Sequence, residues 1–121
     1  MKYYENQIYP IALVLSKDVE SVNKEYYDTC TGEDEDIYQR PSVEASCYML
    51  TRRTKDYHAM AVGIIFRTDK ITSKLKAHEM LHATRFMMEI GVNIPLTDSS
   101  EEAWAYLQGW IAECLDDFLN N

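Results

Sequence analysis

Residues 73–90 read SKLKAHEMLHATRFMMEI, and this stretch determines which fold classes are open to the chain. Thr72 or Ser73 can cap a helix at its start, because a short hydroxyl side chain accepts a hydrogen bond from the free backbone N–H groups of the first turn. Gly91 follows directly and suits the position just past a helix end. We therefore predict a helix that runs to Ile90, with Gly91 as the residue that terminates it.

Residues 78–82 lie inside this predicted helix and read His-Glu-Met-Leu-His, the pattern H-E-x-x-H. Positions four apart share one face of a helix, so the imidazoles of His78 and His82 can reach one Zn²⁺ ion at about 2.0–2.1 Å. Glu79 is rotated by about 100° around the axis and is not needed as a ligand. It is expected to be the catalytic general base, which takes a proton from water at the open position of the metal. The pattern thus predicts one zinc ion per chain.

The same residues also fit a plainer interpretation, an amphipathic helix with two partly exposed histidines beside a glutamate. Leu81, Met87 and Met88 are expected to be core residues under either interpretation. The metal site is favoured because His78 and His82 replace apolar residues on a face that should contact a sheet. The motif also uses two of the 3 histidines in the chain.

A third zinc ligand should come from another element. The candidates are His58, Asp98, Glu101 and Glu102. Glu102 opens a last helix that begins at Ser99, and a short turn between antiparallel helices would bring it back towards His82. The alternative is a capping box, because Ser99 and Glu102 have the S-x-x-E spacing in which the glutamate bonds the helix start. Spacing alone leaves both roles open.

The segment 78–106 resembles the gluzincin branch of zinc metallopeptidases, in which a Glu-Ala pair on the next helix follows H-E-x-x-H. Glu102-Ala103 matches that pair. Residues 101–109, EEAWAYLQG, are also similar to a helix in short proteins encoded by bacteriophages and integrated elements. The resemblance implies a zincin-like fold and peptidase activity. By it, the zinc ligands are His78, His82 and Glu102, and Glu79 is the catalytic base.

The chain departs from that family at two points. Tyr106 stands where thermolysin-like enzymes have an aspartate that orients a ligand histidine. A His or Tyr that would stabilise the oxyanion has no obvious counterpart, although His58, Tyr57 and Tyr106 are candidates. These departures bear on turnover more than on metal binding.

The remaining sequence predicts one α+β domain over residues 1–121. Buried or alternating apolar residues indicate three strands, at 8–15, 43–51 and 57–66, of which the last two pair antiparallel. A helix capped by Ser16 should end near Asp28, and 29–42 should be a solvated loop. The zincin-like arrangement is then a sheet of about three strands. The H-E-x-x-H helix packs on that sheet, and a C-terminal helix beside it carries Glu102.

Composition limits the partners of this 121-residue chain. Its net charge of −8 disfavours nucleic acids and anionic membranes, which are bound mainly through Lys and Arg. Three widely separated cysteines indicate reduced thiols. The apolar run at 11–15 is too short to span a bilayer and lacks signal-peptide features, so a cytoplasmic location is predicted.

The two functional hypotheses are a zinc peptidase with an unknown peptide or protein substrate, and a non-enzymatic phage or mobile-element binding protein with a structural or vestigial metal site.

Overall fold

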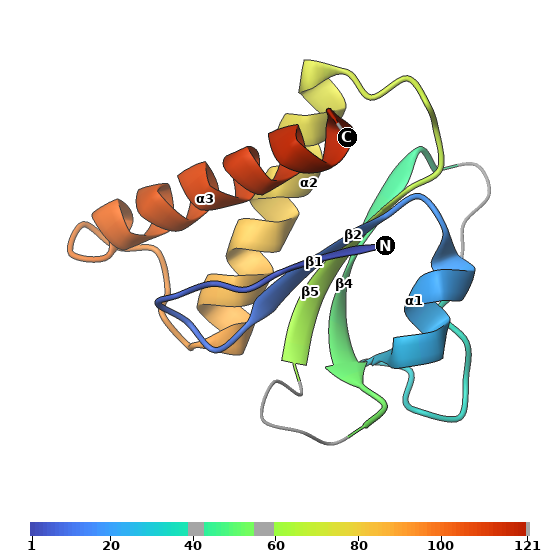
Figure 1. Ribbon diagram of the computed structural model, residues 1–121. Coiled ribbons are helices and arrows are strands. Elements are labelled where there is room, and N and C mark those ends of the chain that lie inside the picture. Colours follow the sequence, from blue (N-terminus) through green and yellow to red (C-terminus); the bar gives the residue numbers. More distant parts are fainter. Residues whose placement is uncertain (39–42, 55–59, 121) are drawn as a thin grey trace.

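A computed structural model describes residues 1–38, 43–54 and 60–120, and it shows an α+β arrangement with α2 and α3 on one face of a sheet and α1 on the other (Figure 1). The five strands have the order β1-β2-β5-β4-β3. The strands are β1 (Lys2–Tyr4), β2 (Ala12–Ser16), β3 (Tyr26–Asp28), β4 (Ala45–Arg52) and β5 (Met60–Phe66). The helices are α1 (Val19–Glu25), α2 (Ser73–Arg85), the π-helical segment η1 (Phe86–Gly91) and α3 (Glu101–Leu119).

The sheet has five strands, and the prediction of about three was therefore wrong. The additional strands are β1, which pairs antiparallel with β2, and β3, which pairs antiparallel with the end of β4. Each has three residues, too few for an alternating apolar pattern to be recognised. The helix predicted to reach Asp28 ends at Glu25, because the fully buried Tyr26 turns the chain into β3. Its N-cap is Asp18, not Ser16.

The central strands of the sheet agree better with the strands predicted from the sequence than the two short outer strands do. Every residue of β2 is buried, as an apolar strand covered on both faces requires. β2 pairs parallel with β5, and β5 pairs antiparallel with β4 as predicted. One core cluster lies between the sheet and the pair α2–α3, and a second lies between the sheet and α1. The sheet thus gives α2 a rigid base.

The helix that carries the motif begins as predicted and ends differently. The Thr72 hydroxyl accepts a hydrogen bond from Leu75 N at 3.1 Å, which makes Thr72 the N-cap. The left-handed residue beyond the helix is Asn93, with φ 56°, so Gly91 is not the terminating residue. Gly91 instead packs closely on Ile11, and a Cβ at this position would force the Cδ1 end of that side chain to shift.

The two long helices run antiparallel. Trp104 Nε1 donates to Ile94 O at 3.0 Å, which places the start of α3 beside the segment after η1. Lys76 Nζ lies 3.8 Å from Asp116 Oδ1, so the end of α3 lies beside the first half of α2. Of the expected core residues on α2 and η1, Met87 and Met88 are buried and Leu81 is 58% exposed. The row buried by α3 is Trp104, Leu107, Ile111, Cys114 and Leu115.

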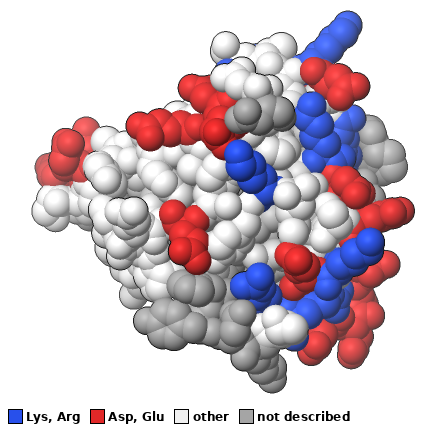
Figure 2. All heavy atoms as spheres, viewed as in Figure 1, with Lys and Arg blue, Asp and Glu red and all other residues white. Residues whose placement is uncertain are grey.

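The N-terminal strand is tied to the C-terminal helix, because Tyr4 Oη donates to Asp117 Oδ2 at 2.7 Å and Lys2 also contacts that carboxylate. Figure 2 shows Lys and Arg interspersed with Asp and Glu on the α1 side of the molecule. None of the helices formed by the described residues has the length and apolar character that crossing a membrane requires.

Candidate metal centre

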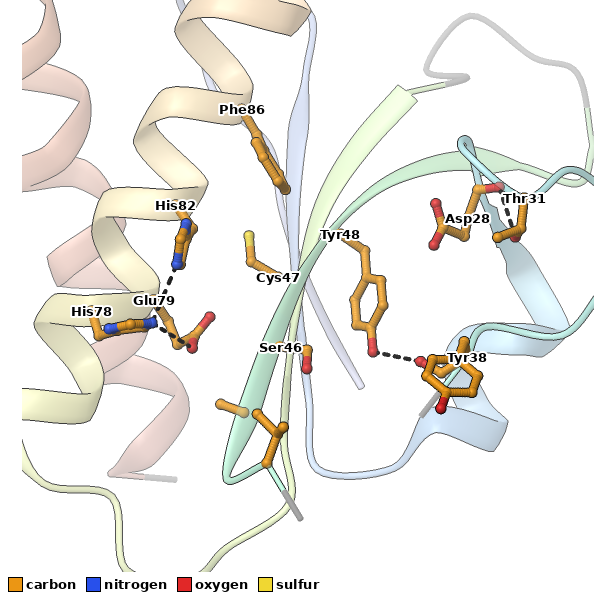
Figure 3. A pocket seen from close by; sticks show the side chains of 12 residues that line it. Asp28, Thr31, Tyr38, Ser46, Cys47, Tyr48, His78, Glu79, His82 and Phe86 are labelled. Atoms are coloured by element: carbon orange, nitrogen blue, oxygen red, sulfur yellow. Dashed lines mark hydrogen bonds and ion pairs between the residues drawn. The ribbon is translucent and has the colours of Figure 1, made fainter. Parts of the chain in front are cut away.

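The two histidines of the motif lie side by side on α2 (Figure 3). Nε2 of His78 is 3.2 Å from Nε2 of His82, and the rings meet edge to face with centroids 4.8 Å apart. Two nitrogens bound tetrahedrally to one zinc ion at about 2.0–2.1 Å are separated by about 3.3 Å. The two Nε2 atoms are therefore spaced as two ligands of one zinc ion would be. Both rings are exposed, so they can be reached from solvent.

Glu79 lies behind the histidines and is buried. Its side chain faces β4, it is 3% exposed, and its Oε1 atom is 3.9 Å from Nε2 of His78. Its Oε2 atom is also buried and has no hydrogen-bond partner among the described residues. Such an atom is costly for stability and is typical of functional sites. Burial raises the pKa of the Glu79 carboxyl, and the nearby charges of His78, His82 and Arg67 oppose that rise.

Cys47 of β4 lies on the same side of the sheet as α2 (Figure 3). Burial raises the pKa of its thiol well above the ordinary value, and the negative charge of Glu79 raises it further. The thiol is therefore protonated at neutral pH in the metal-free protein. A protonated thiol is a poor nucleophile and a poor metal ligand.

A cleft of about 550 Å³ opens between α2 and the loop after β3. One wall is formed by α2 and η1, the floor by the first half of β4, and the opposite wall by residues 28–38. The lining residues are Asp28, Thr31, Tyr38, Val43, Ala45, Ser46, Cys47, Tyr48, His78, Glu79, His82 and Phe86. The motif thus faces a cleft that is large enough to hold several residues of a peptide.

The floor of the cleft is an open strand edge. β3 pairs only with the segment of β4 from Leu50 to Arg52. On the β5 side, Arg67 N donates to Glu44 O at 2.7 Å, and on the β3 side Thr29 N donates to Met49 O at 3.0 Å. Hydrogen-bonding directions alternate along an antiparallel strand, so the backbone N–H and C=O groups of 45 and 47 point away from β5. Within residues 1–38, 43–54 and 60–120, no strand pairs with them there.

The wall opposite the histidines is held by a chain of hydrogen bonds. Tyr48 Oη donates to Tyr38 O at 2.9 Å and accepts from Arg67 Nη2 at 2.8 Å. Arg67 Nη1 donates to Ser46 Oγ at 2.9 Å. These bonds link β4, β5 and the loop after β3. They tie the backbone of Tyr38, which lines the cleft, to the strand that forms the floor.

The structure does not bring Glu102 to the histidines. Met80, which faces α3, is two residues from both His78 and His82 and so lies on the opposite side of α2. Glu102 also lies at the wrong level, because α3 begins beside Ile94, on the order of 12 Å along the axis beyond His82. The spacing argument assumed a short turn, and the actual connector extends past η1. Glu102 is exposed and absent from the cleft lining.

The other residues considered as a third zinc ligand are Asp98, Glu101 and His58. Asp98 and Glu101 are exposed at the same end of α3. His58 and Tyr57 fall outside the described residues. Among those that the structure describes, no three His, Cys, Asp or Glu side chains are grouped to hold a metal ion.

The capping-box alternative for Glu102 is not observed. The N-cap of α3 is Ser100, without a side-chain cap hydrogen bond. Tyr106 is 61% exposed and lines a separate hollow with the segment 5–8. It therefore takes no part in the cleft that holds the histidines.

Sequence reasoning did not identify the residues that complete the cleft. Cys47, Tyr48 and Phe86 belong to no motif, and Tyr38 lies in a stretch expected to be a solvated loop. The alternation of 43–51 was the available signal, because it places residues 45, 47 and 49 on one face of a strand. The face that meets α2 could not be chosen without the topology of the sheet.

Comparisons with models of protein families, with curated proteins and with solved structures give no match to this chain.

Proposed function

We propose that this protein is a zinc-dependent peptidase with a zincin-like fold, which cuts peptides bound in extended form along β4. The observation that supports it best is the group formed by His78, Glu79 and His82. Two imidazole nitrogens lie 3.2 Å apart beside a buried carboxylate oxygen that has no partner among the described residues. A helix that served only for packing would gain nothing from burying that carboxylate.

The open edge of β4 supports a peptide as the substrate. An extended peptide adds to a strand edge through main-chain hydrogen bonds, largely independent of its sequence. The outward N–H and C=O groups of 45 and 47 supply such bonds. The cleft places these groups beside His78 and Glu79, so a bound peptide would carry one of its carbonyl groups to the motif.

Each residue then has a definite role. His78 and His82 would hold zinc through Nε2, and zinc when bound would supply Lewis-acid polarisation of the peptide carbonyl and a lower pKa for water. Glu79 accepts the proton of the attacking water and passes it to the leaving amine. A carboxylate with a raised pKa is a stronger base than an exposed one, which suits this role. The wall opposite the histidines, where Tyr48 Oη bonds Tyr38 O, orients the peptide.

The proposal is tested with zinc-loaded protein and a broad library of internally quenched peptides. We expect cleavage by the wild type and its loss in Glu79→Gln and His82→Ala. Zinc content is measured in each preparation, so that Glu79→Gln is compared with the wild type at equal occupancy. Cleavage that survives Glu79→Gln at full strength would show that another group is the base.

The second candidate is a non-enzymatic protein that binds an extended segment of a partner at the same edge. The open edge of β4 favours this candidate, because such an edge can bind an extended segment whether or not the protein cuts it. Peptides that bind but are never cut, with or without zinc, would favour this candidate. Peptides with N-methyl groups on alternate residues provide the control, since they lose main-chain bonds to β4 while keeping their side chains.

A further inference from the structure

A second cleft continues the first along α2. It has a volume of about 390 Å³ and lies around the first turn of α2 and the start of β4. Val43, Ala45, His78 and Glu79 line both clefts. The motif therefore lies between two hollows that meet at His78 and Glu79.

The order of residues along α2 gives the direction and length of this groove. Thr72 and Leu75 line only the second cleft, and His82 and Phe86 line only the first. From Thr72 to Phe86 the helix advances by about 21 Å at 1.5 Å per residue. An extended peptide advances by about 3.3 Å per residue, so the groove matches about six residues. His78 divides it into a part of about 9 Å and a part of about 12 Å.

The floor supports the same direction. β4 begins beside the second cleft and continues into the first, since Ala45 lines both and Cys47 lines only the first. α2 and β4 thus run in the same sense along the groove (Figure 1). A peptide that pairs with this edge follows both clefts and passes the motif between them.

We infer that the protein cuts internal peptide bonds, in an extended segment of about six residues that occupies the groove on both sides of the motif. This inference rests on the proposed peptidase function. An enzyme that removes terminal residues needs a charged group that fixes the free amine or carboxylate close to the reacting bond. Where the two clefts meet, the shared wall residues Val43 and Ala45 are apolar. Among the residues that the structure describes, the charged ones beyond the motif are Glu44 and Lys74 in the second cleft and Asp28 in the first. Glu44 and Lys74 are exposed and of opposite sign, so they do not form a pocket for one kind of terminus. Asp28 lies across the first cleft from the motif (Figure 3), and its Oδ1 atom accepts a hydrogen bond from Cys30 N at 2.9 Å.

The test uses zinc-loaded wild-type protein and peptides that share one central cleavable bond. One series has acetylated and amidated ends, and the matched series has free ends. Lengths of four, six and eight residues are compared, with additional peptides extended on one side only. Products are identified by mass spectrometry and kcat/KM is measured for each peptide.

We expect blocked and free six-residue peptides to be cut at the central bond with kcat/KM within about threefold of each other. The step from four to six residues should raise kcat/KM about tenfold, with contributions from extension on each side, and the step from six to eight should change it little. Phe86→Ala should reduce the gain from extension on one side only. Leu81→Ala, at an exposed position of the same helix that lines neither cleft, should leave both gains unchanged.

Two results would overturn the inference while leaving the peptidase proposal standing. One is cleavage that requires a free amine or a free carboxylate, and the other is a gain from extension on one side alone. Absence of cleavage in every peptide would instead refute the peptidase proposal, and the inference with it. The failures of the two ideas are therefore distinguishable in one experiment.

Discussion

His78 and His82 direct their Nε2 atoms to within 3.2 Å of each other, although both rings are exposed and free to turn to solvent. Two ring nitrogens at that distance can form a hydrogen bond, whose direction depends on the tautomers of the rings, and they can equally share a cation. A divalent metal ion can therefore take the place of this hydrogen bond without rearranging the helix. Zinc binding at this pair is therefore expected to need little reorganisation of α2.

We expect His78→Ala and His82→Ala each to weaken zinc binding by about a hundredfold or more, since each removes one nitrogen ligand. Zinc per chain after purification and zinc titration by calorimetry measure the effect. Leu81→Ala is the matched control, because it changes an exposed side chain in the same turn. Wild-type protein that takes up no zinc on titration would contradict the metal site altogether.

Glu102→Gln should bind zinc like the wild type, within about twofold. The structure places Glu102 on α3 beyond the end of α2, so its carboxylate is not close to the histidines. The same titration as for the histidine variants gives the comparison. A loss of affinity similar to that of His82→Ala would mean that α3 moves against the motif when zinc binds, as the resemblance to gluzincins implies.

Glu79→Gln should lower peptidase activity by on the order of a hundredfold or more at equal zinc content, the usual scale of a general base. The amide keeps the shape of the side chain but cannot accept a proton from water. The pH profile of kcat/KM adds a second readout, because an acid limb caused by Glu79 disappears in the variant. An unchanged acid limb would assign it to another group.

The same substitution predicts how the stability of the metal-free protein depends on pH. Burial raises the pKa of Glu79 in the folded state, so the folded protein binds more protons than the unfolded chain between the ordinary and the raised value. The contribution of this carboxyl to the free energy of unfolding therefore falls as the pH rises through that window. We expect Glu79→Gln to gain stability relative to the wild type over the same rise in pH. Urea unfolding with a chelator from pH 4 to 8 measures the difference, and a constant difference would contradict the expectation.

The three cysteines should react with thiol reagents at very different rates in the native protein. Cys30 is exposed, whereas burial raises the pKa of Cys114 to about 12 and that of Cys47 well above its ordinary value. Since the thiolate is the reactive form, we expect Cys30 to be alkylated at least about tenfold faster than the other two at pH 8. Mass spectrometry of timed samples identifies the sites. Rapid alkylation of Cys47 would show that the cleft opens more widely than the structure indicates.

The parts of the fold that the sequence predicted are those with long periodic patterns. The helix that carries the motif, the apolar strand β2 and the antiparallel pair β4–β5 all have them. The neighbourhood of His78, Glu79 and His82 followed from helical spacing alone. The location of Glu102 could not follow in this way, because it depends on the length of the connector and on which face of α2 meets α3. The role of Cys47 as a neighbour of Glu79 likewise depends on the order of strands in the sheet.

The parallel pairing of β2 with β5 has a consequence for the order of folding. These strands are neighbours in the sheet but are separated in the chain by α1, β3 and β4, so their pairing must close a long loop. The β4–β5 hairpin and the helix that follows it are contiguous in sequence and lose less chain entropy on assembly. We therefore expect α2 to dock on the hairpin early, and the N-terminal strands to complete the sheet last. The motif on α2 and the floor of the cleft on β4 would then come together before the protein has its full core, and the wall formed by residues 28–38 would follow.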